Sequence, residues 1–160
     1  AAAEAYRLYH EATPELRKWW ERIIKQVLQT KILYNCFGRR QIFLQRLIDN
    51  YGRPIEEEME SIVAFEPQSS IGDKVRQVWY QSEGDSRWPS DARIILNVHD
   101  SLRVLAPHAK VEHCLAIMKE YAEAPLIVHG EKLIIPAECK ISVADEFGIH
   151  RANNLKKVML

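Results

Sequence analysis

Residues 94–105, with the sequence IILNVHDSLRVL, constrain the fold more than any other part of the chain. Two apolar runs, rich in Leu and β-branched residues, flank the polar trio His99, Asp100 and Ser101. Such runs are typical of short strands, so the stretch predicts a tight hairpin with the trio at its tip. A strand-supported tip holds a carboxylate and an imidazole more precisely than a loose loop, as a metal ligand or catalytic group requires. The trio is also compatible with a solvated turn, because Asp and Ser are common turn residues.

Three other stretches have the spacing of amphipathic helices. The first begins at Thr13, which is expected to cap its first turn. The second covers about residues 55–80, and Pro67 is expected to kink it or divide it in two, because proline lacks the backbone donor. The third runs from about residue 107 to residue 121. Each helix is therefore predicted to bury one face.

Extended segments account for most of the remaining chain. Two short runs are predicted around a turn at Gly38, Arg39 and Arg40, and the polar stretch 81–92 is predicted to be a mobile loop. Further strands are expected at 126–129, 132–135 and 138–143. Together with the central hairpin, these strands would form an antiparallel sheet with helices on one face. The predicted fold class is α+β.

Composition and charge narrow the classes of partner. The chain has 160 residues, 47% of them hydrophobic, which suits one domain or a piece of a larger one. Lys plus Arg equals Asp plus Glu, at 22 each, so no net field favours nucleic acid or a membrane surface. Residues 1–46 nevertheless hold nine basic and four acidic side chains. Residues 47–66, in contrast, hold one basic and six acidic side chains. The N-terminal part is thus either a face for an anionic partner or a solvated helix surface.

Three polar side chains are candidates for contact with such a partner. Arg39 and Arg40 carry guanidinium groups, which match phosphate geometry in a bidentate fashion, although they also suit a solvated turn. Gln68 follows Pro67 and has both a donor and an acceptor to offer to a base edge or a sugar. Its alternative role is to cap the broken helix.

Cysteine usage and hydropathy indicate the compartment. The three cysteines show no C-x-x-C spacing, which argues for a reducing environment and against a disulfide framework or a zinc site. No stretch resembles a membrane span or a signal peptide, so an intracellular, cytoplasmic protein without a membrane partner is expected. The chain starts with AAAEAY, without an initiator Met, and this start reads like the middle of a helix. We therefore expect a chain that has been cut, split or truncated.

The motifs, in order, resemble one family. They are T-P-E-L within a helix, F-G-R-R, a Pro-Gln-Ser break, V-H-D between two strands, and P-x-E among the closing strands. This order is similar to the C-terminal part of family A DNA polymerases, the DNA polymerase I family. The resemblance covers nearly all of residues 1–160. It implies a helical part with the G-R-R turn at 1–80 and a palm hairpin, helix and closing strands at 93–160, as part of a larger polymerase fold.

The resemblance also implies roles for individual residues. Asp100 would be one of the catalytic palm carboxylates that bind Mg²⁺, and His99 would lie against the primer terminus. Gln68 would contact the minor groove of the primer-template. Arg39 and Arg40 match the family's G-R-R, which implies a mainly structural role. The resemblance leaves open whether these arginines also contact the DNA backbone. The implied reaction is nucleotidyl transfer from deoxynucleoside triphosphates to a primer by a two-metal mechanism.

The chain departs from the family pattern at three positions. Ser101 stands where Glu is common, Ala64 where Asn is common, and Glu60 where Arg is common. Fewer minor-groove contacts are therefore expected. These departures fit a divergent phage or viral lineage, in a bacterial or phage-infected cell.

The resemblance places the rest of the catalytic machinery outside these 160 residues. The second metal-binding Asp and the nucleotide-binding fingers helix would come from an N-terminal portion, in the same precursor or in a separate subunit. We thus expect the isolated chain to be inactive and the assembled enzyme to be a DNA-directed DNA polymerase. The alternative functions are a non-catalytic module that binds primer-template DNA and an interaction domain without salt-dependent DNA binding.

Overall fold

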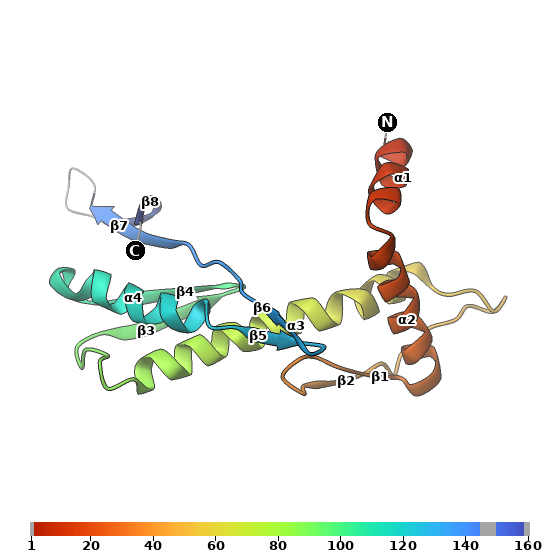
Figure 1. Cartoon of the computed structure of the whole chain (residues 1–160), viewed down its shortest axis with the longest axis horizontal. Helices are drawn as coiled ribbons and strands as arrows, with labels where there is room; N and C mark the ends of the chain where they lie inside the picture. The colour runs from red at the N-terminus through yellow and green to blue at the C-terminus, as the bar shows by residue number, and fades with distance from the viewer. Residues whose placement is uncertain (1, 145–149, 159–160) are drawn as a thin grey trace. The chain divides into compact units, whose positions relative to one another are not determined.

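The computed structural model describes residues 2–144 and 150–158. It confirms the α+β class (Figure 1). The chain divides into two compact units, residues 1–70 and residues 71–160, and each is described here by itself. The elements, in chain order, are α1 (Ala2–Ala12), α2 (Pro14–Thr30), β1 (Ile32–Tyr34), β2 (Arg40–Ile42), α3 (Glu56–Gly84), β3 (Arg93–Val98), β4 (Ser101–Leu105), the 3-10 helix η1 (His108–Lys110), α4 (Val111–Ala122), β5 (Leu126–Val128), β6 (Glu131–Leu133), β7 (Cys139–Ala144) and β8 (His150–Val158).

The first unit has a core between α2, β1, the segment after β2 and the first half of α3. Apolar side chains one helical turn apart on α2, such as Ile23 and Val27, form the buried stripe that the sequence predicts. The rings of Phe43 and Phe65 pack edge to face, with centroids 6.2 Å apart. The buried core residues of this unit are Ile23, Val27, Leu33, Phe43, Leu47 and Ile62.

The junction between α1 and α2 differs from the prediction for Thr13. Its hydroxyl donates to the carbonyl of Tyr9, at 2.7 Å, and makes no capping bond to the amides of α2. Thr13 therefore closes the helix that precedes it. Thr13 thus occupies the predicted N-cap position of α2, with φ −130° and ψ 60°, but its side chain does not make the expected capping bond.

Helix α3 passes through Pro67 without interruption. It runs as one helix from Glu56 to Gly84, so the predicted division in two is wrong. Proline removes one backbone donor, but the neighbouring turns of a helix of 29 residues continue on both sides. The helix also extends four residues into the stretch that was predicted to be a loop, 81–92.

The second unit has a core between the last turns of α3, β3 and α4. Val78, Ile94 and Met118 are its buried cluster, and the rings of Trp79, Trp88 and Tyr121 are among the side chains that pack against them. Lys74 is also buried here, and its ammonium donates to the carbonyl of Ala124 at 2.9 Å. Burial lowers the pKa of Lys74.

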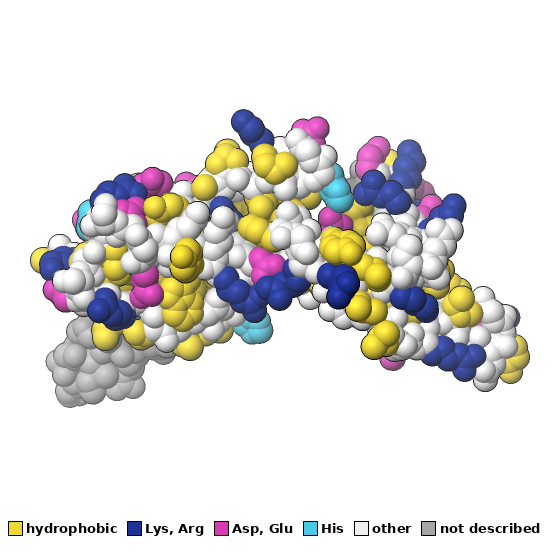
Figure 2. All heavy atoms as spheres, turned by 90° about the horizontal axis from the view of Figure 1, so that it is seen from below, with side chains coloured by type: hydrophobic (Ala, Val, Ile, Leu, Met, Phe, Trp, Pro, Cys, Tyr) yellow, Lys and Arg dark blue, Asp and Glu magenta, His cyan; other side chains and the backbone are white. Residues whose placement is uncertain are grey.

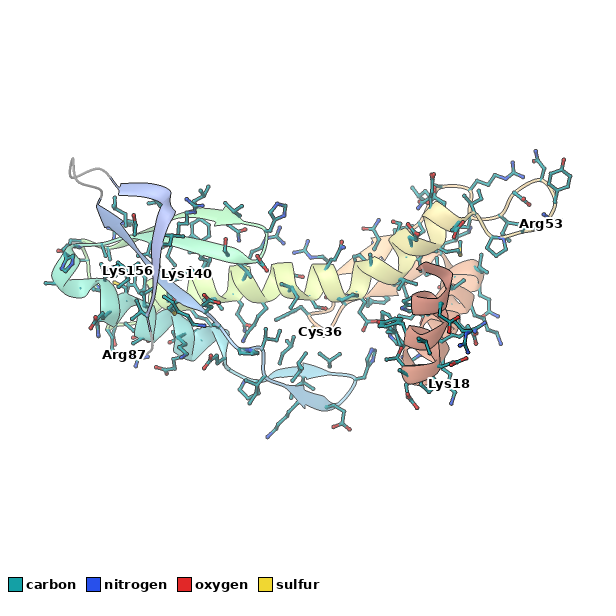
Figure 3. All side chains as sticks on the ribbon, turned by 90° about the horizontal axis from the view of Figure 1, so that it is seen from above. Lys18, Cys36, Arg53, Arg87, Lys140 and Lys156 are labelled. Carbon is teal, nitrogen blue, oxygen red and sulfur yellow. The ribbon has the colours of Figure 1, made fainter. Side chains whose placement is uncertain are left out.

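A cluster of polar side chains fixes the segment between α3 and β3. The Asp85 carboxylate accepts hydrogen bonds from the Arg87 guanidinium, at 2.6 Å, and from the Tyr121 hydroxyl, at 2.8 Å. Arg87, labelled in Figure 3, also pairs with Glu120 at 2.9 Å. Glu83 joins the two elements directly, because its carboxylate accepts from Trp79 Nε1 and from the backbone N–H of Ile94. The segment is thus held by side chains from α3 and α4, and the mobility predicted for it stays a prediction.

The Asp85 cluster predicts a dependence of stability on pH. The hydrogen bond from the Arg87 side chain, with those from the Arg87 N–H and from Tyr121, holds the pKa of Asp85 well below its usual range. A depressed folded-state pKa stabilises the fold above the unfolded-state value of about 4, and this stability is lost as the pH falls further. Asp85→Asn should therefore melt at a lower temperature near neutral pH, by several degrees, and should show a weaker loss on acidification.

Circular dichroism melting curves at neutral and at acidic pH measure this difference. The matched control is Asp91→Asn, in the same segment, because Asp91 pairs with Lys110 at a half-exposed site where an ion pair contributes little. Equal acid sensitivity of Asp85→Asn and the unchanged protein would contradict the role of the cluster.

The strands of the described residues form four separate two-stranded antiparallel sheets. The pairs are β1–β2, β3–β4, β5–β6 and β7–β8, rather than the single sheet that was expected. Alternating hydrophobicity indicates a strand, but it does not identify a lateral partner beyond the next strand in sequence. Among the helices of residues 2–144 and 150–158, none is long and apolar enough to cross a membrane.

Candidate catalytic hairpin

The β3–β4 hairpin has the predicted position and a tighter tip than predicted. Val98 pairs with Ser101, so His99 and Asp100 alone form the loop. Ser101 is the first residue of β4, and its hydroxyl donates to the carbonyl of Val98 at 2.9 Å. The Ser101 side chain thus closes the hairpin. The paired strands β3 and β4 thus fix the position of the Asp100 backbone.

His99 has an unusual backbone conformation. Its φ is 53°, in the left-handed region, where most side chains are disfavoured and His is among the more tolerated. Two-residue hairpin loops require a positive φ at their first position, which explains this conformation. The hairpin therefore imposes strain at a predicted site residue.

The strain at His99 leads to a prediction about substitutions. His99→Val should lower the free energy of unfolding by about 1–2 kcal/mol, because a β-branched side chain is disfavoured at positive φ. His99→Gly relieves the clash and should leave stability close to that of the unchanged protein. Urea denaturation measures both. If the two variants lose the same stability, the loop conformation does not control the effect.

Strand β3 contains a β-bulge at Ile95, before the hairpin loop. Ile94 pairs with Val104 and Leu96 pairs with Arg103, so Ile95 is an extra residue in β3. Ile94 is buried, at 5% exposure, while the adjacent Ile95 is 57% exposed. Bulges bend and twist a strand and re-aim the residues that follow. This bulge sets the direction in which β3 carries His99 and Asp100.

Asp100 is exposed and supplies a single carboxylate. In the part of the chain that the structure describes, no three His, Cys, Asp or Glu side chains gather into a group that could hold a metal ion. Carboxylate oxygen is a ligand that Mg²⁺ prefers, and Mg²⁺ keeps several waters when one or two carboxylates and substrate phosphates bind it. Asp100 thus fits one position of such a site.

The other predicted residues lie in the first unit. Arg39 and Arg40 are adjacent and exposed in the β1–β2 hairpin, where Arg39 ends the turn and Arg40 begins β2. Gln68 is exposed on α3. Because α3 is unbroken, Gln68 does not cap a helix, and its side chain lies at the surface of a continuous helix.

No sequence pattern singles out Glu83, which ties β3 to α3. Its partners, Trp79 and the N–H of Ile94, are four and eleven residues away. The pairing of a carboxylate with a strand amide depends on tertiary structure. The polar composition of the segment is the signal available in the sequence, and it fits a solvated loop equally well.

Comparisons with known proteins give one informative similarity. Over 146 residues, which are 91% of this chain, it is 24% identical to the thermostable DNA polymerase I of Thermus filiformis. The aligned segment is 17% of the length of that polymerase. No family model matches the chain. The similarity suggests a relationship to DNA polymerase I.

Proposed function

We propose that the chain is the C-terminal palm portion of a family A DNA polymerase and takes part in templated nucleotidyl transfer to a primer. One observation carries the proposal. His99 and Asp100 of the V-H-D motif form a two-residue hairpin loop that presents the exposed Asp100 carboxylate. The chain that carries this loop is similar to DNA polymerase I along 91% of its length. The rest of the proposal depends on what this hairpin and the two arginines can bind.

Asp100 would act as a metal ligand. The two-residue loop and the Ser101 hydrogen bond hold its backbone in place, so the carboxylate needs little reorganisation to bind a cation. Magnesium bound there would stabilise the charge that develops on phosphate oxygens during transfer. His99, adjacent in the loop, would lie against the primer end.

The remaining carboxylate would come from outside residues 1–160. Neither β3 nor β4 pairs with a third strand among the described residues, and an unpaired edge accepts a further strand. The hairpin also leaves Leu96, Val98 and Leu105 exposed, which is an apolar surface available for burial. We propose that a strand of an N-terminal polymerase portion pairs here and brings the second carboxylate. The isolated chain would then bind DNA without extending a primer.

DNA contacts would come from the first unit as well. Gln68 would reach the minor groove of the primer-template, and Arg39 and Arg40 would contact phosphates. All three side chains are exposed, as such contacts require. Phosphate contacts would fix position and carry no sequence information.

A second candidate function is a primer-template binding module without catalysis. The observation that favours it is the lone carboxylate at the hairpin tip, with Ser101 used for hairpin closure. It has the same DNA contacts as the first proposal. The two proposed functions differ only in templated primer extension, which the polymerase portion supports and the binding module does not.

The experiment is primer extension by the tagged chain, purified together with any polypeptide to which it is joined or bound. Four primer-templates that differ in the templating base are tested, with and without Mg²⁺, and the isolated chain serves as the control. We expect extension only with the complementary nucleotide, only with Mg²⁺, and only by the assembled protein. DNA binding without extension supports the binding module, and absence of both contradicts the proposal.

A further inference from the structure

The β1–β2 hairpin has a turn that is fixed from inside. Asn35 is buried, and its side-chain oxygen accepts hydrogen bonds from the N–H groups of Phe37, at 3.0 Å, and Arg39, at 2.9 Å. Gly38 supplies the positive φ, 79°, that the turn requires. Cys36, labelled in Figure 3, marks this turn. The turn therefore holds the backbone of Phe37 and Arg39 in one conformation before any ligand binds.

The register places an aromatic ring opposite a guanidinium group. Tyr34 pairs with Arg40, and Ile32 pairs with Ile42, so these four residues share one face of the hairpin. Leu33 lies on the other face and is buried in the core of the unit. Tyr34 is 54% exposed and Arg40 is also exposed. One face of the hairpin thus anchors it, and the other presents Tyr34 and Arg40.

Phe37 and Arg39 add a second aromatic and a second basic side chain at the turn. Phe37 is 38% exposed, and Arg39 is exposed. We call Tyr34, Phe37, Arg39 and Arg40 the β1–β2 platform. On the face shown in Figure 2, hydrophobic side chains lie at the surface next to Lys and Arg.

The charged side chains of the segment that contains the platform are all basic. Residues 31–48 contain four basic side chains, from Lys31, Arg39, Arg40 and Arg46, and neither Asp nor Glu. A basic surface with exposed aromatic rings matches a nucleic acid strand whose bases are unpaired, because each base offers a flat face and each linkage offers a phosphate. In a duplex, the bases stack on one another and their faces are not accessible.

We propose that the β1–β2 platform binds unpaired single-stranded DNA, with bases stacked on Tyr34 and Phe37 and phosphates held by Arg39 and Arg40. This rests on the proposed polymerase function, in which the unpaired strand is the template. The aromatic residues give the platform its preference for single strands. The arginines contribute affinity that is independent of base sequence.

The test measures binding of the full 160-residue chain to a fluorescent oligothymidine of about a dozen nucleotides by anisotropy. Tyr34→Ala and Phe37→Leu should each weaken binding roughly tenfold, since base stacking on a ring is lost. Tyr34→Phe keeps the ring and should bind nearly as well as the unchanged chain. Arg40→Ala should weaken binding and reduce the salt slope by about 1.

The matched control is Tyr51→Ala. Tyr51 is also strongly exposed, but it lies outside the platform, and its removal should leave affinity unchanged. A blunt duplex of the same length should bind Tyr34→Ala and the unchanged chain equally. If the two aromatic variants keep full affinity for the single strand, or the unchanged chain does not bind it, the proposal is overturned. A loss that is equal for duplex and single strand would also overturn it.

Failure of this proposal can be distinguished from failure of the proposed function. Asp100→Asn should strongly reduce primer extension by the assembled protein and leave oligothymidine binding intact. Oligothymidine binding that depends on Tyr34, without any primer extension, would retain the platform and reject the polymerase role. Primer extension by the assembled protein, together with unchanged single-strand affinity of Tyr34→Ala, would retain the polymerase role and reject the platform.

Discussion

Replacement of Asp100 by asparagine is expected to reduce templated primer extension by the assembled protein by about 10³-fold or more. Asparagine has nearly the same size and suits the same loop, so the hairpin should keep its structure. It lacks the negative charge with which a carboxylate holds a divalent cation. Several kcal/mol of charge stabilisation in the transition state would be lost, and each 1.4 kcal/mol or so corresponds to about a tenfold change in rate.

The control for Asp100→Asn is Ser101→Ala, one residue along the hairpin. This variant loses the hydrogen bond to the carbonyl of Val98 but no charge. Its extension rate should fall by no more than about tenfold, in line with the loss of one neutral hydrogen bond. Primer-template affinity should be unchanged in Asp100→Asn. Full activity of Asp100→Asn would show that Asp100 is not a metal ligand.

The second large effect is expected at Ile94, the residue that anchors β3. Ile94 is buried against Val78 and Met118 in the core of the second unit. Ile94→Ala removes three buried carbon atoms and leaves a cavity, so the free energy of unfolding should fall by about 3 kcal/mol. Denaturation in urea, followed by circular dichroism, measures this loss.

Ile95 provides a matched control because it has the same side chain and is the next residue in sequence. It is the extra residue of the bulge and is 57% exposed. Ile95→Ala should therefore change the free energy of unfolding by about 0.5 kcal/mol or less. Equal losses at the two positions, or a larger loss at Ile95, would show that β3 has a different register.

Local patterns in the sequence were sufficient for the position of most elements. Apolar spacing at 3.6 residues predicted α2, α3 and α4, and the V-H-D hairpin was expected where it is observed. The bulge at Ile95 could not be predicted, because four consecutive apolar or amide side chains show no alternation to set the register. Thr13 is at the N-cap position of α2 as expected, but its hydroxyl donates to the carbonyl of Tyr9 in α1, which the capping pattern does not indicate.

Predictions that depend on long-range contacts were less successful. The Pro67 break was expected from local chemistry, whereas helix packing on both sides maintains α3 as one element. The segment around Asp85 has the composition of a loop, but Arg87 and Tyr121 hold it. Tyr121 is 36 residues away from Asp85, a distance over which no sequence pattern operates.

The candidate site was predictable to the extent that it consists of neighbours in sequence. His99 with Asp100, and Arg39 with Arg40, are adjacent residues on hairpins, and each pair lies together in the structure. The roles of these residues and of Gln68 stay predictions. The stacking surface of Tyr34 was not expected, because its pairing with Arg40 emerges only from the register of β1 and β2.

The most direct test of the polymerase assignment is to map the metal site by cleavage with bound Fe²⁺. In the chain purified together with any polypeptide to which it is joined or bound, Fe²⁺ replaces Mg²⁺, and peroxide then generates hydroxyl radicals that cut the backbone close to the metal. We predict a cut at the loop formed by His99 and Asp100, suppressed by excess Mg²⁺ and absent in Asp100→Asn. Cleavage elsewhere, or a cut at this loop that persists in Asp100→Asn, would contradict the assignment of Asp100 as a metal ligand.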